Sequence, residues 1–533
     1  MKKIAVIFFI INSIFLLSCS GIRGNKNDSI VINMGAEPRT IDPSLNNLNF
    51  VSAILFHAFE SLTKIGSDGK VTGGMAESWD ISEDGRVYTF HLRTNALWSD
   101  GKPVTAYDFE YGWKRVINPD VAAEYASLLE LIKNVKEINA GQMDYNEIAV
   151  KALDDYTFEV QLVDPAAYFL EFMTAVNVFS PIRKDIIEQY GDDWTLSPET
   201  YICNGPYKMT ERVMDQYIIF EARDNYYNAE ETIAKKLTFI SMADPNTAIA
   251  GIRGGTIHFS ALEPPSNEIG KLKSENYIVF RDAAGTFYLS LNITNDALKD
   301  KRVRHALSLA VDRNYIVSNI TMGGQMPAQG FIPPTIDGIN NSYRADAGIL
   351  IDTDNYSLNI EKANALMSEA GYANGEGFPI LEIRVSPGLH ITVCEAIQQM
   401  WKSNLNIDAT LKIDEYPMVL QYLLERNFDI GAMNWNADYR DPMTMLEIML
   451  AGNPFNYGLY SNPSYNVLVN NARKTADASL RMNYMINAEK ILIDDMPFVP
   501  LYHTAFTLMV NPKLKGVVYN ALGKHKFNYC YIE

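Results

Sequence analysis

The chain has 533 residues, enough for more than one core, and its 47% apolar and 21% charged composition is that of a folded globular protein. Acidic residues outnumber basic ones by 64 to 46, which gives a net charge of −18. This balance argues against a nucleic-acid partner, because binding to phosphates requires a basic face.

The pattern of the N-terminal residues indicates a targeting segment. Two lysines precede an apolar run from Ile4 to Leu17, which is typical of a secretory signal peptide covering residues 1–18. The run is shorter than the ~20 residues that a helix needs to cross a bilayer. It ends in Leu16-Leu17-Ser18-Cys19, which resembles a bacterial lipobox. We therefore expect a lipid on Cys19, a polar linker over residues 19–29, and membrane attachment through that lipid.

The first predicted elements of the folded part are strands. The segment from Ile30 to Met34 is short and β-branched, and Gly35 and Pro38 bound it, so it predicts a buried strand. The segment from Val87 to Leu92 alternates apolar and polar residues, which predicts a hairpin strand with one face inward.

The pattern changes after Asp300, where apolar residues recur at helical spacing and predict an amphipathic helix. Two further helices are predicted, one from about Ile360 to a capping Gly371 and one containing Met482 to Ile493. Strand-like runs at 277–280 and 498–502 alternate with these helices. The sequence therefore predicts an α/β protein, with mixed sheets.

Four segments carry a more specific signal. They are Ala76-Glu77-Ser78-Trp79, the run from Trp98 to Phe109, the run from Lys301 to Arg313, and Trp435-Asn436-Ala437-Asp438-Tyr439. In this order they resemble the family 5 extracellular solute-binding proteins, specifically the oligopeptide-binding components of ABC oligopeptide permeases. The resemblance covers nearly the whole chain after the linker.

The resemblance implies a fold of two α/β lobes that close like a flytrap, with an extra domain inserted in lobe one. On that pattern we expect the following division: lobe one from 30–62, 183–283 and 506–533; the inserted domain from 63–182; and lobe two from 284–505.

The resemblance also implies a function. We expect a monomeric, lipid-anchored receptor in the cell envelope, facing the periplasm or the exterior, that binds short peptides between its lobes. It would deliver them to membrane-embedded permease subunits and would not be an enzyme. The sequence calls for no cofactor and no metal: Gly251 to Gly255 lacks the ending of a phosphate loop, and the seven histidines never take close metal-ligand spacing.

The same resemblance indicates which residues bind the ligand. Asp438 matches the aspartate that receives the peptide ammonium, a role that suits a carboxylate set among Trp435, Ala437 and Tyr439, where a lone charge would be costly. His390 matches a histidine that meets the carboxylate end of some ligands, and Glu37 matches a glutamate that faces ligand side chains. The further candidates are Trp435, Asn434, Asn436, Tyr125 and Tyr416.

The chain departs from the family pattern at positions that bear on the peptide carboxylate. Ala432 stands where the pattern has an arginine, and Thr321 where it has a lysine, so two cationic anchors are absent. Gly285 and Asn436 occupy the positions of the family's disulfide. These departures leave the preferred peptide length open.

Three alternatives remain. The scaffold also suits narrower ligands, such as dipeptides, cell-wall or signalling peptides, sugars or nickel complexes. A secreted peptidase whose catalytic residues converge in the fold is a second reading, and an adhesion lipoprotein is a third.

Overall fold

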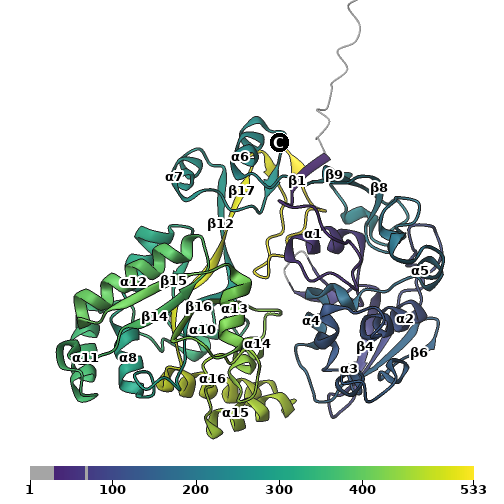
Figure 1. The fold of residues 1–533 in the computed structure, drawn as a ribbon. Coiled ribbons are helices and arrows are strands. Elements are labelled where there is room, and N and C mark those ends of the chain that lie inside the picture. The colour runs from purple at the N-terminus through teal and green to yellow at the C-terminus, as the bar shows by residue number, and fades with distance from the viewer. Residues whose placement is uncertain (1–28, 67–69) are drawn as a thin grey trace, which may run out of the picture.

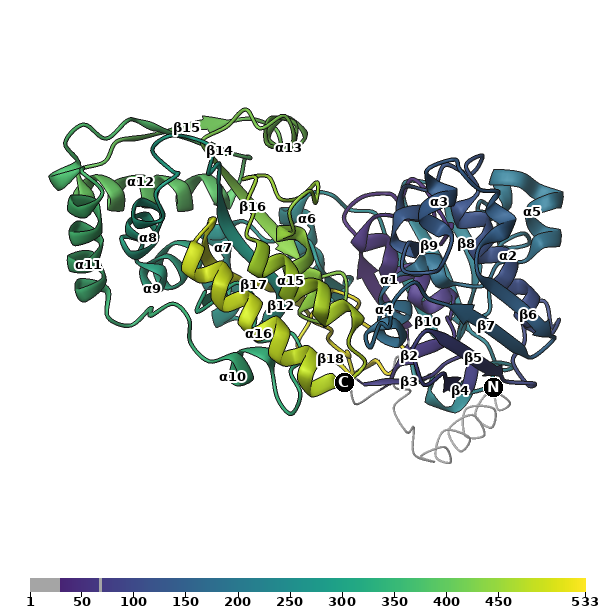
Figure 2. The same cartoon turned by 90° about the horizontal axis from the view of Figure 1, so that it is seen from below.

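The computed structural model describes residues 29–66 and 70–533, and these form two α/β lobes (Figures 1 and 2). The predicted signal peptide, Cys19 and the start of the predicted linker lie outside the described residues. No helix in the described part is long and apolar enough to cross a membrane.

One large mixed sheet runs through the molecule. In spatial order its strands are β15 (Ala409–Ile413), β14 (Leu381–Val385), β16 (Ile430–Asn436), β12 (Ile278–Leu291), β17 (Phe498–Val510), β11 (Phe259–Ser260), β1 (Ser29–Asn33), β10 (Lys236–Ile240), β9 (Tyr217–Ala222) and β8 (Tyr207–Val213), with β13 (Met326–Pro327) beside β17. The expected strand at Ile30 is therefore confirmed as β1, and its β-branched residues lie between two parallel neighbours.

The long antiparallel strands β12 and β17 join the two lobes, and Figure 1 shows them passing from the region of α6 and α7 into the left-hand lobe. Their pairing is interrupted between Asp282 and Thr286. Within this irregular stretch Gly285 lies opposite Asn436 of β16. A Cβ on Gly285 would lie 2.9 Å from the Trp435 backbone carbonyl oxygen, so the close approach of the two strands favours glycine here.

A separate four-stranded antiparallel sheet lies beside α2 in the right-hand lobe of Figure 1, in the order β4 (Ala76–Ile81), β5 (Val87–Leu92), β7 (Thr157–Gln161) and β6 (Val150–Asp154). The predicted hairpin strand is confirmed as β5, with Tyr88, Phe90 and Leu92 buried and the residues between them half-buried. The short hairpin of β2 (Thr63–Ile65) and β3 (Val71–Gly73) precedes this sheet. All these strands fall within 63–182; the proposed domain boundaries stay a prediction.

The helices divide between the lobes as follows. With the four-stranded sheet lie α1 (Asn49–Ala58), α2 (Ala106–Ile117), α3 (Val135–Asn139), α4 (Phe169–Ala175) and α5 (Lys184–Tyr190), and near the connecting strands lie α6 (Pro245–Gly254) and α7 (Ser266–Ser274). The other lobe holds α8 (Lys301–Leu309), α9 (Arg313–Tyr315), α10 (Tyr343–Ala347), α11 (Tyr356–Glu369), α12 (Leu389–Leu405), α13 (Tyr416–Leu424), α14 (Met443–Leu446), α15 (Pro463–Lys474) and α16 (Ala478–Asp495).

The three predicted helices are confirmed as α8, α11 and α16. Gly371 follows α11 with φ +95°, the left-handed conformation expected of a glycine just beyond a helix. On α8 the buried residues include Val303, Ala306 and Leu307, which pack into the core of lobe two.

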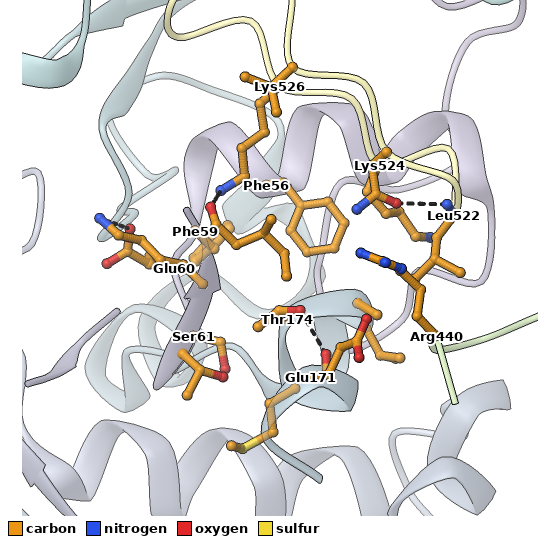
Figure 3. Close-up of a pocket in the computed structure, with 18 of the residues that line it drawn as sticks. Phe56, Phe59, Glu60, Ser61, Glu171, Thr174, Arg440, Leu522, Lys524 and Lys526 are labelled. Atoms are coloured by element: carbon orange, nitrogen blue, oxygen red, sulfur yellow. Dashed lines mark hydrogen bonds and ion pairs between the residues drawn. The ribbon is translucent and has the colours of Figure 1, made fainter. Parts of the chain in front are cut away.

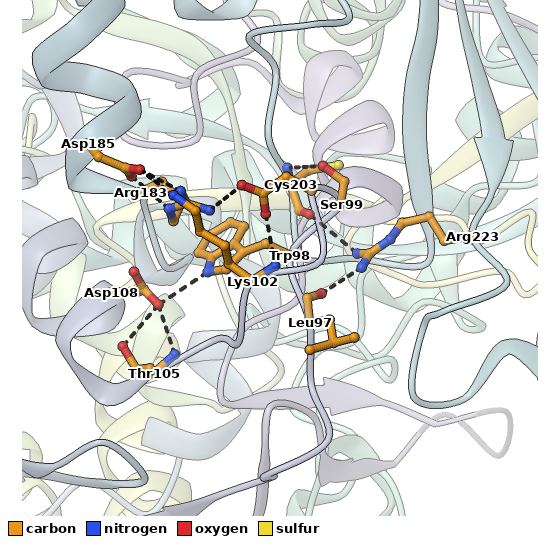
Figure 4. Close-up of polar contacts among 11 residues, drawn as sticks. Leu97, Trp98, Ser99, Lys102, Thr105, Asp108, Arg183, Asp185, Cys203 and Arg223 are labelled. Atoms are coloured by element: carbon orange, nitrogen blue, oxygen red, sulfur yellow. Dashed lines mark hydrogen bonds and ion pairs between the residues drawn. The ribbon is translucent and has the colours of Figure 1, made fainter.

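The segment from Trp98 to Phe109 is a structural junction (Figure 4). The buried Trp98 indole and the Thr105 backbone N–H both donate to the Asp108 carboxylate, at 3.2 and 2.8 Å. Arg183 donates to Asp100 at 2.9 Å, and Arg223 donates to the Leu97 carbonyl at 2.6 Å. This motif therefore ties the start of α2 to distant segments, which explains its residue pattern without a ligand.

Candidate functional site

A cavity of about 190 Å³ opens between the two lobes, and we call it the Asp438 cavity. Its lining comes from widely separated parts of the chain: Asn46, Asn47, Leu48, Ser52, Tyr125, Leu128, Ala175, Val176, Asn177, Ala284, Asn436, Ala437, Asp438, Phe506, Ala521, Leu522 and Lys524. The fold therefore brings the start of α1, the end of α4, the end of β16 and the C-terminal tail to one place.

Asp438 is positioned by the loop that follows β16. Its backbone N–H donates to the Thr444 hydroxyl at 3.2 Å, and the preceding Ala437 N–H donates to the Ala284 carbonyl of β12 at 2.7 Å. Asp438 is an exposed residue in this arrangement of the lobes, and its carboxylate lies in a cavity with protein on several sides. Desolvation by this protein raises the pKa of Asp438 to about 6; the charge of Glu447 adds to the rise, and Lys524 opposes it. Lys524 thus offsets only part of the rise in the pKa of Asp438.

Two other predicted site residues lie with Asp438 in this cavity. Tyr125 donates its hydroxyl proton to the Asn47 carbonyl at 3.1 Å, and burial, followed by the charge of Asp438, raises its pKa. Asn436 lines the cavity and accepts a hydrogen bond from Asn434 at 3.0 Å. The cavity therefore offers amide and hydroxyl groups beside a carboxylate, a set suited to a polar, cationic guest.

Trp435 lies on the opposite face of β16, because successive side chains of a strand alternate. Its indole donates to the Thr444 carbonyl at 3.0 Å, and its ring lies 5.0 Å from that of Phe455. Through Thr444 it supports the loop that positions Asp438. Asn434 shares the face of Asn436 and contacts the cavity through it.

The remaining predicted residues lie away from the Asp438 cavity. Glu37 forms an ion pair with Arg212 at 3.1 Å and accepts from Ser241 at 2.8 Å. His390, in the first turn of α12, stacks on Phe287 with ring centroids 4.3 Å apart. Tyr416 is the first residue of α13 and is 54% exposed. Each of these roles stays a prediction.

A second cavity of about 110 Å³ lies next to the first, and we call it the Glu171 cavity (Figure 3). Phe56, Glu171, Arg440, Lys524 and Lys526 are among its lining residues, and it shares Ala175, Val176, Ala521, Leu522 and Lys524 with the Asp438 cavity. Burial raises the pKa of Glu171 to about 7, an effect that Arg440 opposes.

Sequence reasoning missed Lys524 and Glu171. Lys524 is separated by 86 positions from Asp438, and neither residue belongs to a recognisable motif. The one local signal was the basic character of the Gly-Lys-His-Lys segment at 523–526 in an otherwise acidic chain.

Comparisons with known proteins identify the scaffold. Residues 70–457 match the model for bacterial extracellular solute-binding proteins, family 5. The oligopeptide-binding protein OppA of Bacillus subtilis is 30% identical over 550 residues, covering all of both chains. The periplasmic oligopeptide-binding protein OppA of Salmonella typhimurium is 31% identical over 522 residues, covering 96% of this chain and 93% of its own.

Solved structures agree with this assignment and also report on conformation. The chain matches Haemophilus influenzae OppA in complex with the peptide RPPGFSPFR with a TM-score of 0.74, at 31% identity, over 95% of this chain and 99% of the other. It matches the unliganded open form of the murein tripeptide-binding protein MppA with a TM-score of 0.83, at 28% identity, over 95% and 98%. The arrangement of the lobes is thus nearer to the open form.

Proposed function

This chain belongs to family 5 of the bacterial extracellular solute-binding proteins, and from that premise we propose that it captures short peptides by their free amino terminus at Asp438. The observation that carries the proposal is the position of Asp438, an accessible carboxylate in a cavity whose lining comes from both lobes. A peptide ammonium supplies the charge-assisted hydrogen bonds that this carboxylate lacks.

Binding is coupled to movement of the lobes. The open arrangement prevails until a ligand contacts both lobes at once, and the closed form then gains those contacts. Closure excludes water from Asp438, which strengthens its interaction with the ammonium. The main-chain amides of the peptide pair with exposed backbone groups, so that affinity depends on features that every peptide shares.

The chain serves as the receptor of an ABC importer and catalyses no reaction. Its relatives are solute-binding proteins, which place it outside the cytoplasm. Beyond this, we propose that Cys19 carries a lipid that tethers a monomeric receptor to a membrane, and that permease subunits take up the peptide. The lipobox-like tetrad and the polar residues after it support the tether.

The carboxylate end of the peptide sets the length preference. Ala432 lies in β16 and Thr321 ends the short π-helix from Ile316 to Thr321; both are buried and uncharged. Since neither position offers a cation, we propose that His390 or bridging water contacts the carboxylate, which permits a range of lengths.

Peptide affinity should fall as the pH falls through about 6. In the empty receptor Asp438 has a pKa of about 6, and a bound ammonium lowers it, so binding requires the ionised form. Glu447 and Lys524 are the charged groups that set this pKa together with burial. Well below pH 6 the dissociation constant of a free tripeptide should rise by up to about tenfold per pH unit. Calorimetric titrations between pH 7 and pH 4.5 measure this, and the control is an N-acetylated tripeptide, which should not lose affinity as the pH falls.

Ligands retained from the cell test the function as a whole. The protein lacking residues 1–19 is purified and weighed by native mass spectrometry, then denatured so that the released small molecules can be sequenced. We expect a mixture of short peptides with free amino termini. A single compound from folded protein would favour a narrower ligand, and cleavage of added peptides would support a peptidase instead.

A further inference from the structure

Asp438 and Lys524 face the Asp438 cavity, and every other described residue that lines it is uncharged. The acid comes from the loop after β16 and the base from the C-terminal tail. The peptide groups of Ala284 hold both segments: its N–H donates to the Ala521 carbonyl at 2.8 Å, and its carbonyl accepts from the Ala437 N–H at 2.7 Å. Backbone contacts thus bring the two segments that carry one acidic and one basic residue to the same small cavity.

Each of the two charges favours the ionised form of the other. Burial lowers the pKa of Lys524 to about 8, and Asp438 acts in the opposite direction. Burial and Glu447 raise the pKa of Asp438, and Lys524 acts against them. In the empty receptor Lys524 therefore lowers the electrostatic cost of the ionised Asp438 carboxylate, an effect of the same sign as that of a peptide ammonium.

Lys524 also lines the Glu171 cavity, and the two cavities share the lining residues Ala175, Val176, Ala521 and Leu522 as well. Its ammonium lies 5.9 Å from the centre of the Phe56 ring, and Figure 3 shows Lys524, Arg440 and Glu171 arranged around this cavity. A lysine side chain is a flexible four-carbon stem, so its charge can move between the cavities while the backbone stays in place.

The Glu171 carboxylate can pair with the Lys524 ammonium. Its carboxylate is desolvated, and the neighbouring Arg440 guanidinium forms an ion pair with Asp337. Arg440 is thus shared between two acids, while Asp337 and Asp441 further disfavour the ionised form of Glu171. A second cation would stabilise Glu171 in its ionised state.

We propose that Lys524 is the internal counter-ion of Asp438, and that the ammonium of an incoming peptide displaces it toward Glu171. The inference rests on the proposed function, since it takes capture of free amino termini at Asp438 as its starting point. A free ammonium competes with Lys524 for the carboxylate, whereas a blocked amino terminus has no charge with which to do so. Lys524 therefore sets both the affinity for free peptides and the selectivity against blocked ones.

Calorimetry with trialanine and N-acetyl-trialanine at pH 7 tests the proposal. Lys524→Met should tighten trialanine binding by about tenfold and leave the acetylated peptide unchanged. The gain should vanish in an Asp438→Asn background, because Lys524 and the peptide ammonium then have no carboxylate at position 438 for which to compete. Glu171→Gln should weaken trialanine binding in the protein that has Lys524, but not in Lys524→Met. Lys526→Met is the matched control and should not tighten trialanine binding. Lys526 lines the Glu171 cavity but not the Asp438 cavity, and it donates to the Ile65 carbonyl.

Lys524→Gln repeats the test with a polar side chain, and thermal unfolding verifies that each variant is folded. Weaker trialanine binding by both Lys524 variants, or an equal gain in the Asp438→Asn background, would overturn the proposal. If Asp438→Asn discriminates the two peptides but the Lys524 variants change nothing, the inference alone fails. If the unmodified receptor binds neither peptide, the proposed function fails as well.

Discussion

Replacement of Asp438 by asparagine should weaken the binding of a tripeptide with a free amino terminus by about 30- to 1,000-fold. Loss of one partner of a close, desolvated charge pair costs about 2–4 kcal/mol, which corresponds to that range. Asparagine keeps the shape of the side chain but removes the negative charge that receives the ammonium. Calorimetric titration of the purified receptor measures the change.

Two controls isolate the charge at Asp438. The N-acetylated tripeptide should lose little affinity in Asp438→Asn, because it has no ammonium. Asp296→Asn makes the same change in net charge at a side chain that is 96% exposed, and it should bind both peptides as the unmodified receptor does. An equal loss for free and acetylated peptides would contradict ammonium recognition at Asp438.

Replacement of Asp42 by alanine should lower the free energy of unfolding by about 3–5 kcal/mol. Asp42 accepts from both terminal nitrogens of Arg115, at 3.1 and 2.7 Å, and from the Trp194 indole at 3.1 Å. The side chains of the ion pair are 7% and 3% exposed, so the substitution leaves a buried guanidinium without its charge partner. Urea unfolding followed by tryptophan fluorescence measures the loss.

The same pair links the segment before α1 to α2, so its loss should loosen the packing of the four-stranded sheet against the rest of the lobe. Asp296→Ala removes an exposed partner of Lys299 and should leave the urea midpoint unchanged. An Asp42→Ala midpoint equal to that of this control would show that the buried network adds no stability.

Elements with a strong local pattern were predictable from the sequence. The strand Val87–Leu92 and the helix Lys301–Leu309 were found because one face of each is apolar at the period of its structure. The wider architecture followed from the family resemblance rather than from periodicity. Domain boundaries had no local signal, because β12 and β17 belong to a sheet that runs through both lobes.

The site was only partly predictable. Asp438 carried a family motif, whereas Lys524 reaches the same cavity because Ala284 bonds to the tail and to the Asp438 loop at once. Such convergence depends on backbone contacts between segments more than 80 positions apart, which no residue pattern encodes. Glu37 illustrates the same limit, since its partner Arg212 lies 175 positions away in the sequence.

A crystal structure of the receptor with a bound tripeptide tests the central claim most directly. We expect the lobes to be closed and the peptide ammonium to lie within about 3.2 Å of the Asp438 carboxylate oxygens. A peptide bound with its ammonium away from Asp438, while Asp438 keeps Lys524 as its partner, would contradict the account.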